Sequence, residues 1–118
     1  MPIERLRAGP RMSQVVIHNK TVYLAGQVAE EPAGKGVGEQ TRQILATIDG
    51  LLAEAKTDKT RILSATIWLT SMSTFGEMNK VWDQWVAPGS TPARATVESA
   101  KLAGPEYRIE ISVIAAQP

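Results

Sequence analysis

The sequence predicts a two-layer α+β domain in which two helices cover one face of a single β-sheet. Two segments, at about residues 39–55 and 74–85, repeat apolar side chains at the helical spacing. Short alternating or β-branched runs lie before, between and after them, so the expected order is β-β-α-β-α-β-β. No repeat or linker divides the 118 residues, and we therefore expect one domain over residues 1–118.

The first two strands are expected to form a hairpin. Residues 15–18 and 21–25 are β-branched runs, and Asn19-Lys20 between them has the length of a two-residue hairpin turn. His18, the one histidine of the chain, stands beside this turn. We therefore favour a surface role for His18 over a role as general base.

The first predicted helix follows a loop at 32–38 that contains three glycines and a proline. Its apolar stripe consists of Ile44, Leu45, Ile48, Leu51, Leu52 and Ala55. The second is expected to begin with a capping box, in which Thr74 caps the helix and Glu77 reaches back to the N–H of that cap. Four large apolar residues then follow at helical spacing, namely Phe75, Met78, Trp82 and Trp85.

The three later strands alternate between apolar and polar residues. In residues 62–70 the polar set includes Trp68; in residues 92–98 it is Arg94, Thr96 and Glu98, and in residues 107–113 it is Arg108, Glu110 and Ser112. If the helices cover the apolar set of every strand, Arg94 and Glu110 lie together on the opposite face of the sheet. One interpretation is a solvated face. Its short polar side chains and Trp68 instead favour packing against another subunit.

Composition excludes several classes of function. Thirteen basic and 12 acidic residues give a net charge of +1, which offers no electrostatic reason to expect nucleic acid or an anionic membrane as partner. Because cysteine is absent, a thiolate nucleophile and a soft-metal site are excluded within one chain. The N-terminus has no apolar signal region and no stretch reaches the length of a membrane span, so we expect a cytoplasmic protein.

Three segments resemble the Rid family of imine and enamine deaminases, also called the YjgF or endoribonuclease L-PSP family. Thr91 to Glu98 resembles the family's Pro-Ala-Arg strand, and Arg108 to Ala116 resembles its Ile-Glu-Ile strand. Ala25-Gly26-Gln27 resembles its Ser/Thr-Gly-Gln element. Val15 to Asn19 and Met78 to Trp85 are similar to one branch of the family, and the likeness covers nearly the whole chain.

The resemblance implies a chorismate-mutase-like fold with one mixed sheet and two helices on one face. It also implies a homotrimer whose sheets face inward, with active-site clefts between adjacent subunits. The implied activity is hydrolysis of 2-imino acids, such as 2-iminopropanoate and 2-iminobutanoate, and of their enamine tautomers. The products would be 2-keto acids and ammonia, formed without metal or organic cofactor.

The same resemblance assigns roles to particular residues. Arg94 matches the arginine that binds the substrate carboxylate, a task suited to a planar guanidinium. Glu110 matches the glutamate that orients a water and accepts its proton. Ala25 and Gly26 resemble the backbone wall of the pocket, and Thr96, where many members have cysteine, is a further substrate-binding position.

The chain departs from the family pattern in two places. The aromatic residue that well-known members carry before the first hairpin falls here on Arg11 or Met12, and we include Met12 among the substrate-binding residues. Ala25 replaces a serine and so lacks a side-chain hydroxyl. Both changes bear on substrate range.

Other interpretations stay open at this level. Arg94 could form a salt bridge between subunits, Glu110 could be the structural partner of Arg94, and Glu98 is a competing carboxylate. The main alternative function is a non-catalytic trimer that binds a small carboxylate as a sensor or scaffold. An endoribonuclease is less favoured, because the chain lacks a basic patch with interleaved aromatic residues and has only one histidine.

Overall fold

The computed structural model describes residues 2–118 and contains six strands and two helices. The strands are β1 (Glu4–Ala8), β2 (Ser13–His18), β3 (Thr21–Leu24), β4 (Ile62–Leu69), β5 (Ala93–Glu98) and β6 (Ile109–Ala116). The helices are α1 (Val37–Glu54) and α2 (Phe75–Trp85), and short 3-10 turns lie at Lys59–Arg61 and Met72–Thr74. The strands form one mixed sheet in the order β1-β2-β3-β6-β4-β5, in which only β4 and β5 run parallel.

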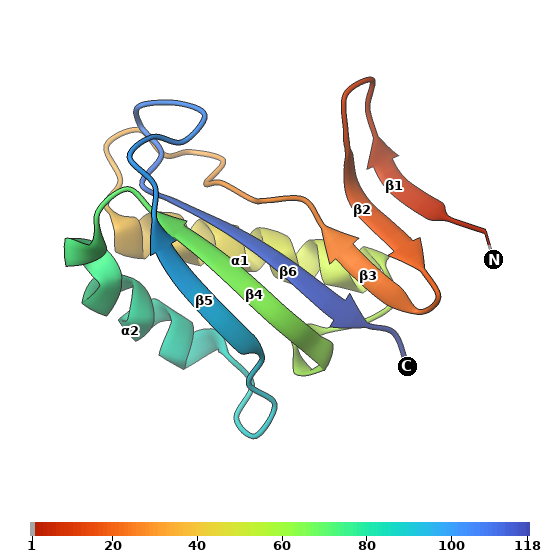
Figure 1. Ribbon diagram of the computed structural model, residues 1–118. Coiled ribbons are helices and arrows are strands. Elements are labelled where there is room, and N and C mark those ends of the chain that lie inside the picture. The colour runs from red at the N-terminus through yellow and green to blue at the C-terminus, as the bar shows by residue number, and fades with distance from the viewer. Residues whose placement is uncertain (1) are drawn as a thin grey trace.

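Figure 1 shows α1 running behind the sheet and α2 beside β5, while the face toward the viewer has no covering layer. The two helices contact each other, and both contribute to one hydrophobic core with the covered face of the sheet. The two-layer α+β fold is thereby confirmed, as is the apolar stripe of α1, all of whose members are buried. Neither helix in the described chain combines the length and apolar character that a membrane crossing needs.

The hairpin between β2 and β3 has the predicted turn. His18 pairs with Thr21, and the two residues between them, Asn19 and Lys20, have φ values of 51° and 62°. These left-handed conformations match the right-handed twist of the flanking strands in two-residue hairpins. His18 lies half-buried beside this turn, as expected.

The first strand was not predicted. In β1 every residue except Leu6 is exposed, so its sequence carries no amphipathic alternation. Backbone pairing with β2 and one ion pair hold it in place. The Arg7 guanidinium bonds both carboxylate oxygens of Glu54 on α1, at 2.6 and 3.0 Å.

The strand β5 faces the opposite way from the prediction. Ala65 and Ile67 of β4 are buried under the helices, and they pair with Arg94 and Thr96. Paired residues on neighbouring strands point to the same face, so Arg94 and Thr96 face the helices. Glu110 pairs with Trp68 and faces the open side of the sheet. The prediction that Arg94 and Glu110 share the non-helical face is therefore wrong, because register with β4, and not polarity, decides the orientation of this edge strand.

The small apolar residues of β5 consequently lie on the open face. The exposed side chains there are Ala93, Ala95 and Val97, and Val97 retains 44% of its accessible surface. On β4 the alternation is as predicted from Ser64 onward. Leu63 differs, with 53% exposure, since a register shift between Ile62 and Ser64 gives the core position to Ile62.

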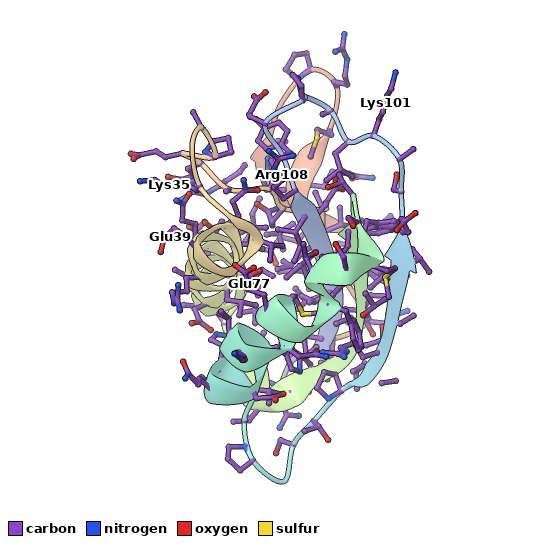
Figure 2. The ribbon with its side chains drawn as sticks, turned by 90° about the vertical axis from the view of Figure 1, so that its left-hand side faces the viewer. Lys35, Glu39, Glu77, Lys101 and Arg108 are labelled. Carbon is purple, nitrogen blue, oxygen red and sulfur yellow. The ribbon has the colours of Figure 1, made fainter. Side chains whose placement is uncertain are left out.

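The predicted capping box is also wrong. The side chain of Thr74 makes no cap bond to α2, and its Oγ1 donates to the Ser71 carbonyl at 2.7 Å. Glu77 instead accepts the backbone N–H of Gly38 at 2.9 Å, and Figure 2 shows Glu77 between the two helices. The N-cap residue of α1 is Gly36, which has no side chain to satisfy the first-turn N–H groups. Glu77 therefore caps α1 from the neighbouring helix.

We expect Glu77→Ala to lower the free energy of unfolding by about 1 kcal/mol, because α1 loses this cap. Urea denaturation followed by circular dichroism measures the change. Glu39→Ala is the matched control, since Glu39 lies in the first turn of α1 with an exposed ion pair to Arg42 at 3.6 Å. Equal losses in the two variants would contradict the capping role.

Candidate functional site

Arg94 is a half-buried cation on the helix-facing side of β5. Its guanidinium carbon lies 5.2 Å from the ring centre of Trp82 and 5.8 Å from that of Phe75, both on α2. Within residues 2–118 no carboxylate lies within salt-bridge distance of Arg94. A guanidinium held this way keeps N–H groups for an external carboxylate, which it can bind through two parallel hydrogen bonds.

Glu110 is a half-buried carboxylate on the open face of β6. It packs directly over Gly26, where an added Cβ would overlap the Glu110 carboxylate. A side chain at position 26 would therefore displace the Glu110 carboxylate, whereas the backbone angles there do not require glycine. Among the described residues no backbone carbonyl accepts the Gly26 N–H, which lies exposed beside the carboxylate.

The segment around Gly26 is fixed by glutamine side chains. Ala25 donates its backbone N–H to the Gln14 carbonyl at 2.9 Å. The Gln27 side chain donates to Gln14 Oε1 at 2.8 Å and to the Ala25 carbonyl at 2.9 Å. The backbone of Gln27 also pairs with Ile111 on β6. These bonds join the segment to β2 and β6 and so hold the backbone wall next to Glu110.

The predicted site residues fall into two groups within one chain. Ala25, Gly26 and Glu110 come together on the open face, whereas Arg94 and Thr96 lie on the helix-facing side. The strand β4 separates β5 from β6, so the two groups are about 10 Å apart across the sheet as well as on opposite faces. Arg94 is level with Val113, three residues along β6 from Glu110. One chain cannot place both side chains against one small ligand.

Met12 belongs to neither group. It lies in the turn between β1 and β2, where its carbonyl accepts the Gly9 N–H at 2.7 Å, and 48% of its surface is exposed. It precedes Gln14 by two residues, which places it toward the Ala25 end of the open face.

The contact of Arg94 with Phe75 and Trp82 was not predicted from the sequence. These two residues are seven apart on α2, so they share one face of the helix, and this spacing was visible in the sequence. The contact could not be predicted because it depends on the face to which β5 turns Arg94. Two buried oxygens lie on the same two elements, Asn79 Oδ1 on α2 and Thr96 Oγ1 on β5, and neither has a hydrogen-bond partner within residues 2–118.

We expect Thr96→Val to raise the free energy of unfolding by about 1 kcal/mol, because it removes a buried hydroxyl that has no partner. Guanidinium denaturation measures the change. Thr41→Val is the matched control with the opposite sign, since Thr41 is fully buried and its hydroxyl donates to the Val37 carbonyl at 2.6 Å. A loss of stability in Thr96→Val would mean that its hydroxyl has a partner in solution.

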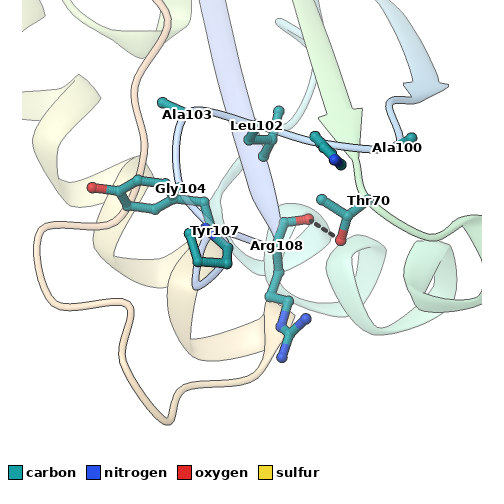
Figure 3. Close-up of a pocket in the computed structure, with 9 residues that line it drawn as sticks. Thr70, Ala100, Leu102, Ala103, Gly104, Tyr107 and Arg108 are labelled. Carbon is teal, nitrogen blue, oxygen red and sulfur yellow. Dashed lines mark hydrogen bonds between the residues drawn. The ribbon is translucent and has the colours of Figure 1, made fainter.

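A separate cavity of about 450 Å³ lies at the loop between β5 and β6 (Figure 3). Its walls include Thr70, Lys101, Leu102, Tyr107 and Arg108. The Thr70 hydroxyl donates to the Arg108 carbonyl at 3.5 Å, and the Arg108 side chain points away from the loop. None of the predicted site residues lines this cavity. In the part of the chain that the structure describes, no three acidic or histidine side chains form a group that could hold a metal ion.

Comparison with known proteins identifies the family. A family model described as endoribonuclease L-PSP matches residues 2–117. A RutC family protein from Haemophilus ducreyi is 46% identical over 114 residues, which cover 97% of this chain and 96% of that protein. A crystal structure of a YjgF family member from Neisseria meningitidis has a TM-score of 0.95 at 46% identity, covering 100% of this chain and 97% of that chain.

A more distant relative carries the name of an enzyme. The 2-iminobutanoate/2-iminopropanoate deaminase from Bos taurus is 36% identical over 111 residues, which cover 89% of this chain and 79% of the bovine protein. The resemblance drawn from the sequence motifs is confirmed at the level of the family. The chain belongs to the endoribonuclease L-PSP family, the family of the YjgF and RutC proteins.

Proposed function

We propose that this protein hydrolyses small 2-imino acids and their enamine tautomers to 2-keto acids and ammonia, at a site that two copies of the chain complete. The single observation that carries the proposal is Arg94. A half-buried guanidinium without a carboxylate partner in residues 2–118 is suited to binding the carboxylate of a small acid. The name of the bovine relative supports the choice of a 2-imino acid.

The remaining chemistry needs one base and one positioned water. Water adds its oxygen to the imine carbon and gives a proton to the Glu110 carboxylate, which passes it to the nitrogen. This gives a carbinolamine, whose hydroxyl proton passes through Glu110 to the amino nitrogen as the C–N bond breaks, so that ammonia leaves and the carbonyl of the 2-keto acid forms. Because imine hydrolysis proceeds readily in water, positioning and these two proton transfers are the catalysis that the site needs to supply. The free N–H of Gly26, next to Glu110, is available to the substrate.

The two faces of the sheet require a second copy of the chain. Arg94 and Glu110 act together only if Arg94 of one subunit meets Glu110 of another, since β4 separates them within a chain. The open face supports such an assembly. It presents Ala93, Ala95, Val97, Tyr23 and the half-buried Trp68, an apolar surface that a partner subunit would bury. We propose a homotrimer, as the family resemblance implies.

The test generates 2-iminopropanoate or 2-iminobutanoate with an amino-acid oxidase and follows imine decay against semicarbazide as a competing trap. We expect wild-type protein to accelerate decay, and Arg94→Ala to lower kcat/KM by about a hundredfold. Arg42→Ala is the control, because Arg42 is an exposed arginine on α1 with a single ion pair at 3.6 Å. Equal decay with wild type and with no protein would reject the deaminase.

A non-catalytic carboxylate-binding protein is the alternative that this experiment separates. Its signature would be stabilisation of the wild type by pyruvate or 2-oxobutanoate without turnover of either imine. Ala25, one of the two departures from the family pattern, lies next to Gly26 and so on the side of Glu110, whereas Met12 lies in the turn between β1 and β2. Loss of turnover with retained binding is the outcome expected if those departures abolish catalysis.

A further inference from the structure

Arg94 is a long, flexible side chain, and its guanidinium must be fixed before it can select a carboxylate. A free arginine loses about 2 kcal/mol of rotamer entropy when it is ordered. Phe75 and Trp82 lie two helical turns apart on one face of α2, and the Arg94 guanidinium carbon lies over both rings, at 5.8 and 5.2 Å. Both distances fall within the range of cation–π attraction.

The two rings differ in burial, and the difference separates their roles. Trp82 is 5% exposed and belongs to the hydrophobic core, so packing alone accounts for it. Phe75 is 37% exposed at the first turn of α2, and it lies outside the core cluster. A phenylalanine at this position contributes little to the core. Its ring instead lies against the Arg94 guanidinium.

Two buried polar atoms where α2 packs near β5 lack hydrogen-bond partners within residues 2–118. Asn79 lies between Phe75 and Trp82 along α2, and its buried Oδ1 has no partner in residues 2–118. Thr96 Oγ1, two residues after Arg94 on the same face of β5, has none either. Buried polar atoms without partners are rare in protein interiors, and local violations of this kind are expected at functional sites.

We propose that Phe75 and Trp82 form an aromatic shelf that holds the Arg94 guanidinium, and that Phe75 is a positioning residue for the carboxylate of the substrate. The inference rests on the proposed function and names a residue that acts through Arg94. Rings that contact the face of a guanidinium leave its in-plane N–H groups free for a carboxylate. The shelf therefore fixes the anchor without occupying the groups that bind.

The shelf predicts a specific kinetic pattern for Phe75→Leu, which keeps an apolar side chain and removes the ring. Because Arg94 binds the carboxylate equally before and during the reaction, KM is expected to rise about fivefold to tenfold while kcat stays nearly unchanged. Phe75→Tyr, which keeps the ring, is expected to retain the wild-type KM. The dissociation constant of 2-oxobutanoate, measured by isothermal titration calorimetry, is expected to change in the same way as KM.

Trp85→Leu is the matched control on the same helix. The Trp85 ring lies 5.2 Å from Lys59 Nζ, and its Nε1 donates to Asp49 at 3.0 Å, so this variant removes a cation-bearing ring that does not contact Arg94. We expect its KM to stay close to that of the wild type. Equal rises in Trp85→Leu and Phe75→Leu would assign the effect to the packing of α2 and overturn the shelf.

Imine turnover and the binding of 2-oxobutanoate test the proposed function and the aromatic shelf separately. If the wild type binds 2-oxobutanoate without hydrolysing imines, the deaminase is rejected, and weaker binding by Phe75→Leu alone still supports the shelf. If Phe75→Leu binds and turns over substrate as the wild type does, the shelf is rejected and the deaminase stands. A wild type that neither binds 2-oxobutanoate nor hydrolyses imines would overturn both.

Discussion

Chains carrying Arg94→Ala and chains carrying Glu110→Gln, each strongly impaired alone, are expected to regain imine hydrolysis when they are unfolded, mixed equally and refolded together. The reason is that Arg94 and Glu110 lie on opposite faces of the sheet, so the proposed site takes one of them from each of two subunits. In every mixed trimer one site combines the two intact side chains, and about one quarter of the wild-type activity should return overall.

A mixture of Arg94→Ala with the double variant Arg94→Ala/Glu110→Gln is the control for this experiment. No chain in that mixture carries Arg94, so activity should stay at the level of the single variant. If the first mixture also stays inactive although native mass spectrometry shows mixed trimers, both side chains must serve the site from within one chain. Such a result would contradict the orientation of β5. A monomeric mass for the wild type would remove the shared site altogether.

Gln40→Leu is expected to lower the free energy of unfolding by about 4 kcal/mol, the largest stability effect that we predict. Gln40 is fully buried on α1, and its Nε2 donates to the carbonyls of Lys35 and Glu106 at 2.9 and 3.0 Å. Its Oε1 accepts the Arg108 N–H at 2.9 Å. Leucine fills the space and removes three hydrogen bonds between a fully buried side chain and the backbone, a cost of about 1–1.5 kcal/mol for each bond.

Gln43→Leu is the matched control, one turn further along α1. Gln43 also bonds backbone, to the Glu31 N–H at 3.0 Å and the Glu31 carbonyl at 3.2 Å, but it is half-exposed. Water can replace those partners, so we expect a loss below about 1 kcal/mol. Chemical denaturation of both variants measures the difference. Similar values for Gln40→Leu and Gln43→Leu would show that burial does not amplify the loss at position 40.

Gln40→Glu adds a dependence on pH. A carboxylate at this position would face backbone carbonyls in a buried site, so its pKa in the folded protein would lie above the unfolded value of about 4.3. The variant should therefore be most stable below that pH and lose stability as the pH rises through its folded pKa. Denaturation at acidic and neutral pH distinguishes this pattern from that of Gln40→Leu.

Local patterns predicted most of the fold. Asn19-Lys20 is a hairpin turn because a two-residue connection needs left-handed backbone, and the stripe of α1 is buried as its spacing requires. The strand β1 could not be predicted, because its exposed residues carry no alternation and its place depends on pairing with β2. The cap supplied by Glu77 was missed for a similar reason, since its partner Gly38 is 39 residues away in the sequence.

The candidate site could also be predicted only in part, because some of its geometry depends on residues that are distant in the sequence. The motifs around Arg94 and Glu110 marked both residues, and the family resemblance marked Gly26, but the contact between Gly26 and Glu110 depends on the pairing of Gln27 with Ile111 and appears only in the structure. The face on which Arg94 lies does not follow, because polarity in β5 suggested one side and parallel register with Ala65 imposes the other. An edge strand has a single neighbour, so one pairing decides its orientation.

The exposed apolar side chains of β5 affect how the chain folds and avoids aggregation. Ala93, Ala95 and Val97 stand uncovered on a strand whose outer edge has no neighbour in the sheet. A freshly synthesised chain that has folded alone therefore offers both a hydrophobic stripe and unpaired backbone groups to any chain nearby. If the chain assembles through this face as proposed, assembly and aggregation compete for the same strand during refolding, and the outcome depends on chain concentration. Polar replacements at these positions should make the lone chain more soluble and its assembly weaker.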